Sequence, residues 1–110
     1  MKILFTSANN SWNALLDSRF GRAKGFVVYD DETDQLSLYP NKNIDIAHGA
    51  GPKAAQFAID SGASVLITGH VGPTAFDVLK QSDIKVYNSG EGTLKKVYED
   101  FQQSNLKEQV

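Results

Sequence analysis

The two histidines of the chain each stand beside a glycine-rich turn that leads into Gly-Pro. His48 precedes Gly49-Ala50-Gly51-Pro52, and His70 lies between Gly69 and Val71-Gly72-Pro73. Proline suits the first turn of a helix, so both turns are expected to open helices whose first backbone N–H groups have no partner. Such helix ends attract anions, and imidazole is a common metal ligand. The spacing predicts a site for something anionic, metallic or both, with His48 and His70 as candidate metal ligands.

Glycine, and not a capping side chain, occupies the expected N-cap position of each helix, at Gly51 and Gly72. No hydroxyl or carboxylate then satisfies the first amides, which are left for water or a ligand. Glycine also lets a bound group come close to the backbone. We therefore take Gly49, Gly51, Gly69 and Gly72 as candidate binding residues. The simpler alternative is that water satisfies both helix ends.

The two arginines of the chain, Arg19 and Arg22, lie in one glycine-containing loop. Planar guanidinium groups suit carboxylate and phosphate ligands, so both are candidate anion-binding residues. The alternative is that one of them pairs with Asp17 or Asp30. Two histidines are too few for a closed zinc site, but Asp17 or Asp45 would complete a partial ligand set with open positions.

The pattern of apolar residues changes along the chain. Strands are expected at residues 2–6, 25–29, 36–39, 64–68 and 84–87, and helices from Pro52, from Pro73 and around residues 94–101. The order β-β-β-α-β-α-β-α predicts an α/β domain with a mixed five-stranded sheet and helices on its faces. Residues 107–110 are expected to form a frayed tail.

Ligands in such sheets usually bind beyond the carboxyl ends of the parallel strands. Ser7, the loop to Gly21, Gly69-His70 and Asn88-Ser89 follow expected strands, so they should gather at that edge.

The composition narrows the function classes. A chain of 110 residues suits one domain, residues 1–110, and a net charge of −2 gives no basic field for nucleic acid or membrane surfaces. The absence of cysteine excludes disulfides, thiolate zinc sites and an iron–sulfur cluster held by the chain's own thiolates. The apolar run Ile3-Leu4-Phe5 is too short for a signal segment or a membrane span. We expect a cytoplasmic monomer.

Several enzyme classes lack their motifs. No Gly-x-Ser-x-Gly occurs, and Gly49-Ala50-Gly51-Pro52-Lys53 does not have the spacing of a P-loop. The first expected strand, Lys2 to Thr6, carries no carboxylate for a nuclease-type metal centre.

Three motifs together resemble the dinitrogenase iron–molybdenum cofactor biosynthesis family. They are D-x-R-F-G-R-A at residues 17–23, H-G-A-G at 48–51 and I-T-G-H-V-G-P-x-A-F at 67–76. The resemblance extends over nearly the whole chain. It implies a ribonuclease H-like three-layer α/β/α fold without the nuclease carboxylates. It also implies transient, non-covalent binding of an anionic iron–sulfur or iron–molybdenum type cluster, or its precursor, with His48 and His70 at the positions of suspected cluster ligands.

Three functions from different classes remain open at this point. The first is a non-enzymatic carrier that receives a cluster from one protein and delivers it to another. The second is a small enzyme or sensor that binds an anionic metabolite at the same helix ends. The third is a protein-interaction module with no ligand. Bound iron after anaerobic purification favours the first, a tightly bound metabolite without metal the second, and a large exposed apolar patch the third.

Overall fold

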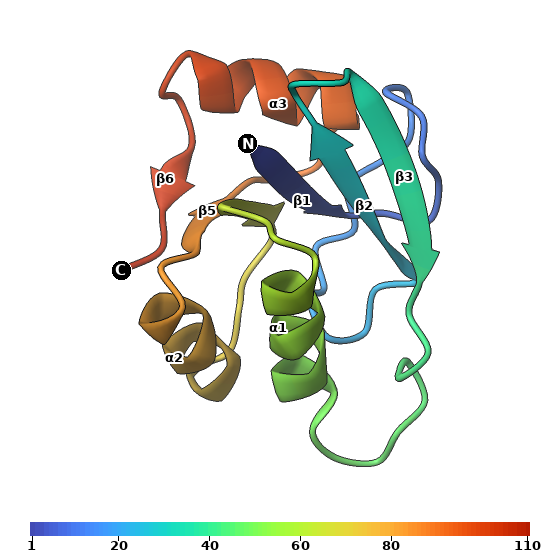
Figure 1. Ribbon diagram of the computed structural model, residues 1–110, viewed down its shortest axis with the longest axis vertical. Coiled ribbons are helices and arrows are strands. Elements are labelled where there is room, and N and C mark those ends of the chain that lie inside the picture. The colour runs from blue at the N-terminus through green and yellow to red at the C-terminus, as the bar shows by residue number, and fades with distance from the viewer.

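A six-stranded mixed sheet lies between two layers of helices in the computed structural model, which describes residues 1–110 (Figure 1). In chain order the elements are β1 (Lys2–Thr6), β2 (Gly25–Asp30), β3 (Gln35–Pro40), α1 (Ala50–Asp60), β4 (Val65–Thr68), α2 (Pro73–Gln81), β5 (Lys85–Asn88), α3 (Leu94–Gln102) and β6 (Lys107–Glu108). No helix has the length and apolar character needed to cross a bilayer.

The strand order is β3-β2-β1-β4-β5-β6. Strands β1 to β3 form an antiparallel meander, whereas β4 runs parallel to β1 and β5 parallel to β4. The carboxyl ends of β1, β4 and β5 therefore meet at one edge of the sheet. The predicted mixed sheet is confirmed, and so are the three helices.

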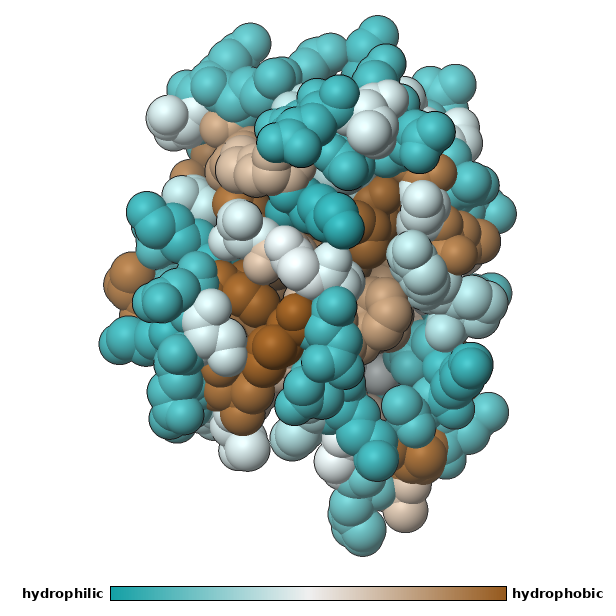
Figure 2. All heavy atoms as spheres, in the orientation of Figure 1, coloured by the Kyte–Doolittle hydropathy of each residue, from teal (hydrophilic) through white to brown (hydrophobic).

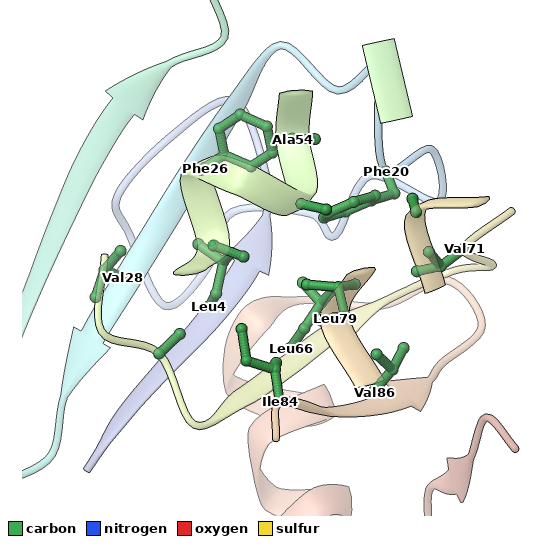
Figure 3. Close-up of a cluster of buried hydrophobic side chains, with 14 residues drawn as sticks. Leu4, Phe20, Phe26, Val28, Ala54, Leu66, Val71, Leu79, Ile84 and Val86 are labelled. Atoms are coloured by element: carbon green, nitrogen blue, oxygen red, sulfur yellow. The ribbon is translucent and has the colours of Figure 1, made fainter. Parts of the chain in front are cut away.

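Helices α1 and α2 lie side by side on one face of the sheet (Figure 1). Beneath them is a cluster of buried side chains that includes Leu4, Phe26, Leu66 and Val86 from four strands. Phe20, from the loop between β1 and β2, reaches into the same cluster (Figure 3). Because neighbouring side chains on a strand point to opposite faces, the adjacent residues serve the other side of the sheet.

The opposite face is covered by α3 and by the loop that carries Trp12 (Figure 1). Ile3, Phe5 and Ile67 point to this side, where Leu94 and Val97 of α3 pack against them. Strands β1 and β4 are buried on both faces, which explains their unbroken apolar sequences.

The prediction of five strands and a frayed tail is wrong. Residues Lys107–Glu108 form β6, which pairs antiparallel with Tyr87 and Asn88 at the edge of the sheet. A strand of two exposed residues has no apolar alternation, so the sequence pattern could not reveal it. The pairing covers part of the β5 edge, whose backbone groups would otherwise face solvent.

The predicted start of α2 is confirmed, with Gly72 as the N-cap and Pro73 as the first helical residue. The predicted glycine-rich turn also opens α1, but the helix starts two residues earlier than expected: α1 begins at Ala50 and its N-cap is Gly49, with φ 81°, and not Gly51. The first N–H groups of any helix have no intrahelical partner, so proline fits at Pro52 inside the first turn as well as at its first position.

The core predicts a simple stability contrast. Replacing Leu66 with alanine should lower the free energy of unfolding by about 2–5 kcal/mol, because its side chain is fully buried between β4 and the α1–α2 layer. Leu15→Ala is the control, since Leu15 is 70% exposed and its loss should change stability by less than about 0.5 kcal/mol. Urea denaturation measures both; equal effects would contradict the burial described.

Candidate functional site

The loop between β1 and β2 crosses the carboxyl ends of the parallel strands. Ser7 and Leu16 form one isolated bridge, and Arg19 and His70 form another. Where the loop passes over Gly69, a Cβ at that residue would overlap the carbonyl oxygen of Ser18. The glycine therefore serves the close approach of two backbone segments.

Two threonines, at the ends of β1 and β4, hold this loop in place. The Thr6 hydroxyl is 2.7 Å from the Thr68 hydroxyl, and both side chains are fully buried. Thr6 Oγ1 also donates to the carbonyl of Asp17, at 2.6 Å. This pair ties the ends of β1 and β4 to the loop, and it satisfies polar groups that would be costly to bury alone.

The starts of α1 and α2 share one depression of about 200 Å³, which we call the helix-start depression. Its lining residues are Phe20, Gly21, Gly51, Pro52, His70, Gly72, Pro73, Thr74 and Ala75. The two helix starts, beside which the sequence predicts a site, thus face one depression. His70, Gly51 and Gly72 are the predicted site residues that line it.

Four backbone N–H groups at these helix starts have no acceptor within the protein, those of Ala50, Gly51, Thr74 and Ala75. Neither N-cap, Gly49 or Gly72, offers a side chain to accept from them. The two helix dipoles add partial positive charge at the same place. The arrangement suits an anion.

His70 is exposed, and its backbone is held on both sides. The Gln109 amide pairs with Val71 in two hydrogen bonds, Val71 N to Oε1 at 3.1 Å and Nε2 to the Val71 carbonyl at 2.7 Å. Asn88 Nδ2 donates to the carbonyl of Gly69 and, at 3.0 Å, to Gln109 Oε1. Three side-chain hydrogen bonds thus fix the turn that presents His70.

His48 is exposed and is not among the residues that line the helix-start depression. It lies in the loop between β3 and α1, one residue before the Gly49 cap. Arg22 holds this loop, because its Nη1 donates to the carbonyls of Ile44, at 2.8 Å, and Ile46, at 2.6 Å. Arg22 therefore positions the loop that carries His48.

Arg19 pairs with Asp17, as the alternative interpretation of the sequence expected. Its Nε and Nη2 donate to the two carboxylate oxygens at 3.1 Å each. Partial burial raises the pKa of Asp17, but the Arg19 side-chain and backbone hydrogen bonds lower it more, so the net pKa is below the ordinary value. The Arg19 side chain is 60% exposed, so this pair is open to competition from solvent and other anions.

The chain has no group of three or more His, Asp or Glu side chains that could hold a metal ion. His48 and His70 are thus not joined by Asp17 or Asp45 in a ligand cluster. The glycines differ in role: Gly49 supplies a left-handed backbone, Gly69 admits Ser18, and a Cβ at Gly72 would meet nothing within 4 Å.

Sequence reasoning missed Thr6, Thr68, Asn41 and Gln109. Asn41 is buried, and its Nδ2 donates to the carbonyls of Gly21, at 3.0 Å, and Ala23, at 2.9 Å. The two threonines could have been predicted, because each is the last residue of an expected strand, at the edge of the sheet where ligands usually bind. Gln109 carried none, because its partner Val71 is 38 residues away.

Comparisons with known proteins place these features in a family. A family model described as dinitrogenase iron-molybdenum cofactor matches residues 1–104. The orange protein of Desulfovibrio gigas, in its apo form, is 39% identical with a TM-score of 0.92, and the match covers 99% of this chain and 92% of that chain.

Two further relatives are similar. A Thermotoga protein, described as a proposed NifB protein, is 33% identical with a TM-score of 0.83, over 97% of this chain and 91% of its own. A Methanocaldococcus jannaschii protein of uncharacterized function is 29% identical over 92 residues, which are 81% of this chain and 75% of that protein.

The hydrogen bonds to Val71 predict a local effect of Gln109→Ala. The amide hydrogen of Val71 should exchange faster with solvent, because it loses its acceptor, and stability should fall by about 1–3 kcal/mol. Gln56→Ala is the control, since its side chain bonds only to the exposed Asp60. Hydrogen exchange followed by NMR measures both. An unchanged Val71 amide in Gln109→Ala would show that this side chain does not hold the His70 turn.

Proposed function

Since the chain belongs to the dinitrogenase iron–molybdenum cofactor family, we propose that it is a non-enzymatic carrier of an anionic iron–sulfur–metal cluster or a related cofactor precursor. The cargo is held in the helix-start depression. The observation that carries this proposal is the convergence of unpaired backbone N–H groups from two helix starts on one depression that His70 also lines. Hydrogen-bond donors and helix dipoles at one point favour negative charge.

The size of the depression supports a compact cargo. Pockets for organic ligands are usually roughly 300–1,000 Å³, whereas this depression is about 200 Å³. An inorganic cluster fits such a space better than a nucleotide does.

Gly72 supports a ligand at the same place. Its φ of −64° is open to any residue, and a side chain there would meet no protein atom. Serine or aspartate would cap α2 better than glycine. A bound anion explains why glycine is present. The anion can occupy the space that a capping side chain would fill, and it can accept hydrogen bonds from the same backbone amides.

His70 is the proposed ligand to a metal atom of the cargo. Its imidazole is exposed at the rim, while hydrogen bonds to Gly69 and Val71 hold its backbone. His48 is the proposed second ligand. Because it does not line the depression, the loop between β3 and α1 would have to move His48 toward the cargo. A carrier has to release what it binds. Binding through few metal ligands from the chain, together with hydrogen bonds from backbone amides, suits such dissociation.

Arg19 is proposed to assist by exchanging Asp17 for the anion, since exposed ion pairs are weak. Arg22 is proposed to act indirectly, through the carbonyls of Ile44 and Ile46. Without cysteine in the chain, the cargo brings its own sulfide.

The relatives support the theme of the proposal. The structure of the orange protein is described as an apo form, which means that this relative has a ligand. The proposed NifB identity of the Thermotoga protein fits cluster assembly. We propose cluster-donating and cluster-receiving proteins as the partners of this chain, in the cytoplasm. A ribonuclease H-like classification belongs to the same proposal; the antiparallel meander followed by parallel crossovers supports it.

Histidine ligation predicts how binding responds to pH. The probe is an iron–tetrathiomolybdate anion, in which iron is bound to two sulfides of tetrathiomolybdate and keeps two halide ligands; an imidazole can ligate this iron by displacing a halide, under anaerobic conditions. Affinity of the wild type should fall as the solution is acidified from about pH 8 to pH 5.5, as far as the probe stays intact, because imidazole ligates only without its second proton. His70→Ala should bind at least about tenfold weaker, roughly 1.4 kcal/mol, and with little pH dependence. His48→Ala should shift in the same direction.

The contrary outcome is specific. If wild type, His48→Ala and His70→Ala share one affinity and one pH profile, histidine ligation is wrong and the helix starts alone hold the anion. If molybdate, which has the same charge but neither iron nor sulfide, binds as tightly as the iron–tetrathiomolybdate anion, the site is a general oxyanion site.

A further inference from the structure

A second and larger hollow lies on another flank of α1. Its volume is about 360 Å³, and it is lined by Phe26, Tyr39, Pro40, Asn41, Lys42, Asn43, Lys53, Ala54 and Phe57. We call it the aromatic hollow. A neighbouring hollow of about 310 Å³ shares Tyr39 and Phe57 with it. Figure 2 shows apolar atoms at the surface between α1 and the β3 edge, ringed by hydrophilic residues.

Three aromatic rings form the wall of this hollow. Phe57 of α1 stacks on Phe26 with ring centroids 4.8 Å apart, and Tyr39 lies 5.4 Å from Phe57. Tyr39 is 44% exposed, whereas Phe26 is buried. Phe57 is half-buried, so part of its ring, like the exposed ring of Tyr39, remains open to a flat partner. Aromatic faces of this kind stack on planar groups.

Two lysines stand at the rim without partners. Neither Lys42 nor Lys53 forms an ion pair or a side-chain hydrogen bond, and none of the nine lining residues is acidic. Lys53 also lies near the positive end of α1, where the helix dipole disfavours a cation. In a chain of net charge −2, this pair is a local excess of positive charge next to an apolar wall.

The loop that carries Lys42 is already fixed. The side-chain Nδ2 of Asn41 donates to the carbonyls of Gly21 and Ala23, and its Oδ1 accepts from the backbone amide of Asn43 at 3.0 Å. The backbone amide of Asn41 donates to the carbonyl of Lys24 at 3.0 Å. A preformed loop loses little conformational freedom on binding, which favours affinity.

We propose that the aromatic hollow binds a small organic anion with a flat apolar body, such as an aromatic carboxylate or sulfonate. The body stacks on Tyr39 and Phe57, and the anionic group lies between Lys42 and Lys53. The volume falls within the range of organic-ligand pockets, unlike that of the helix-start depression. The two sites share α1 but no lining residue.

Anilinonaphthalene sulfonate is the probe, because it joins a flat aromatic body to one sulfonate. The folded wild type should bind it, and NMR shifts should centre on Tyr39, Lys53 and Phe57. Lys42→Gln/Lys53→Gln should weaken binding at least about tenfold. The control is Lys80→Gln/Lys85→Gln, which removes equal charge from exposed residues outside all the hollows and should bind as the wild type does.

Two further experiments distinguish the contribution of aromatic stacking to binding from that of charge. Tyr39→Ala should weaken binding, whereas Tyr39→Phe should keep it, because the ring and not the hydroxyl makes the contact. Phenylnaphthylamine, which lacks the sulfonate, should bind the wild type at least about tenfold more weakly than the sulfonate does.

Three results would each overturn the proposal. They are no detectable binding at about millimolar probe, shifts centred elsewhere, for example on Trp12 and Tyr98, and equal affinity for the wild type and the Lys42→Gln/Lys53→Gln variant. Because the NMR spectrum reports folding in every sample, loss of binding through unfolding is recognised and excluded.

Discussion

The close crossing of Ser18 over Gly69 is the contact on which the site depends. No side chain fits at Gly69, so the loop between β1 and β2 can lie directly on the end of β4. That position brings Arg19 beside His70 and sends Phe20 into the core beneath α1 and α2. The same loop places Gly21 against the start of α1, where a Cβ would come within 2.7 Å of the Gly51 nitrogen. One loop thus contacts the start of α1 and the turn that leads into α2.

Much of the fold follows from local patterns. Alternating or unbroken apolar runs located β1 to β5 within a residue or two, and the 3.6-residue period located α3. Local sequence patterns did not predict the exact start of α1 or the strand β6. Proline fits throughout the first turn of a helix, so it marks the start of α1 only within a few residues. Strand β6 exists because β5 offers it an edge, which is a tertiary property.

The site was predictable in part for the same reason. Glycines and a histidine at strand ends and helix starts indicated the depression that Gly51, His70 and Gly72 line. The partners of polar side chains were not predictable, because they depend on contacts between distant segments. Arg22 hydrogen-bonds to the carbonyls of a loop more than twenty residues away, and Gln109 pairs with Val71. Backbone amides are present in every residue type except proline, so the sequence does not mark those of Gly51, Thr74 and Ala75, which line the depression and have no acceptor within the protein.

The central proposal is that those amides and His70 hold a metal–sulfide cluster whose sulfide does not come from the chain, which has no cysteine. The most direct measurement is metal and acid-labile sulfide analysis of the protein purified without oxygen from its own source cells. The account predicts iron or molybdenum together with sulfide, at no more than about one cluster per chain. Protein that carries neither metal nor sulfide, or that carries a tightly bound organic anion in the helix-start depression instead, would contradict it.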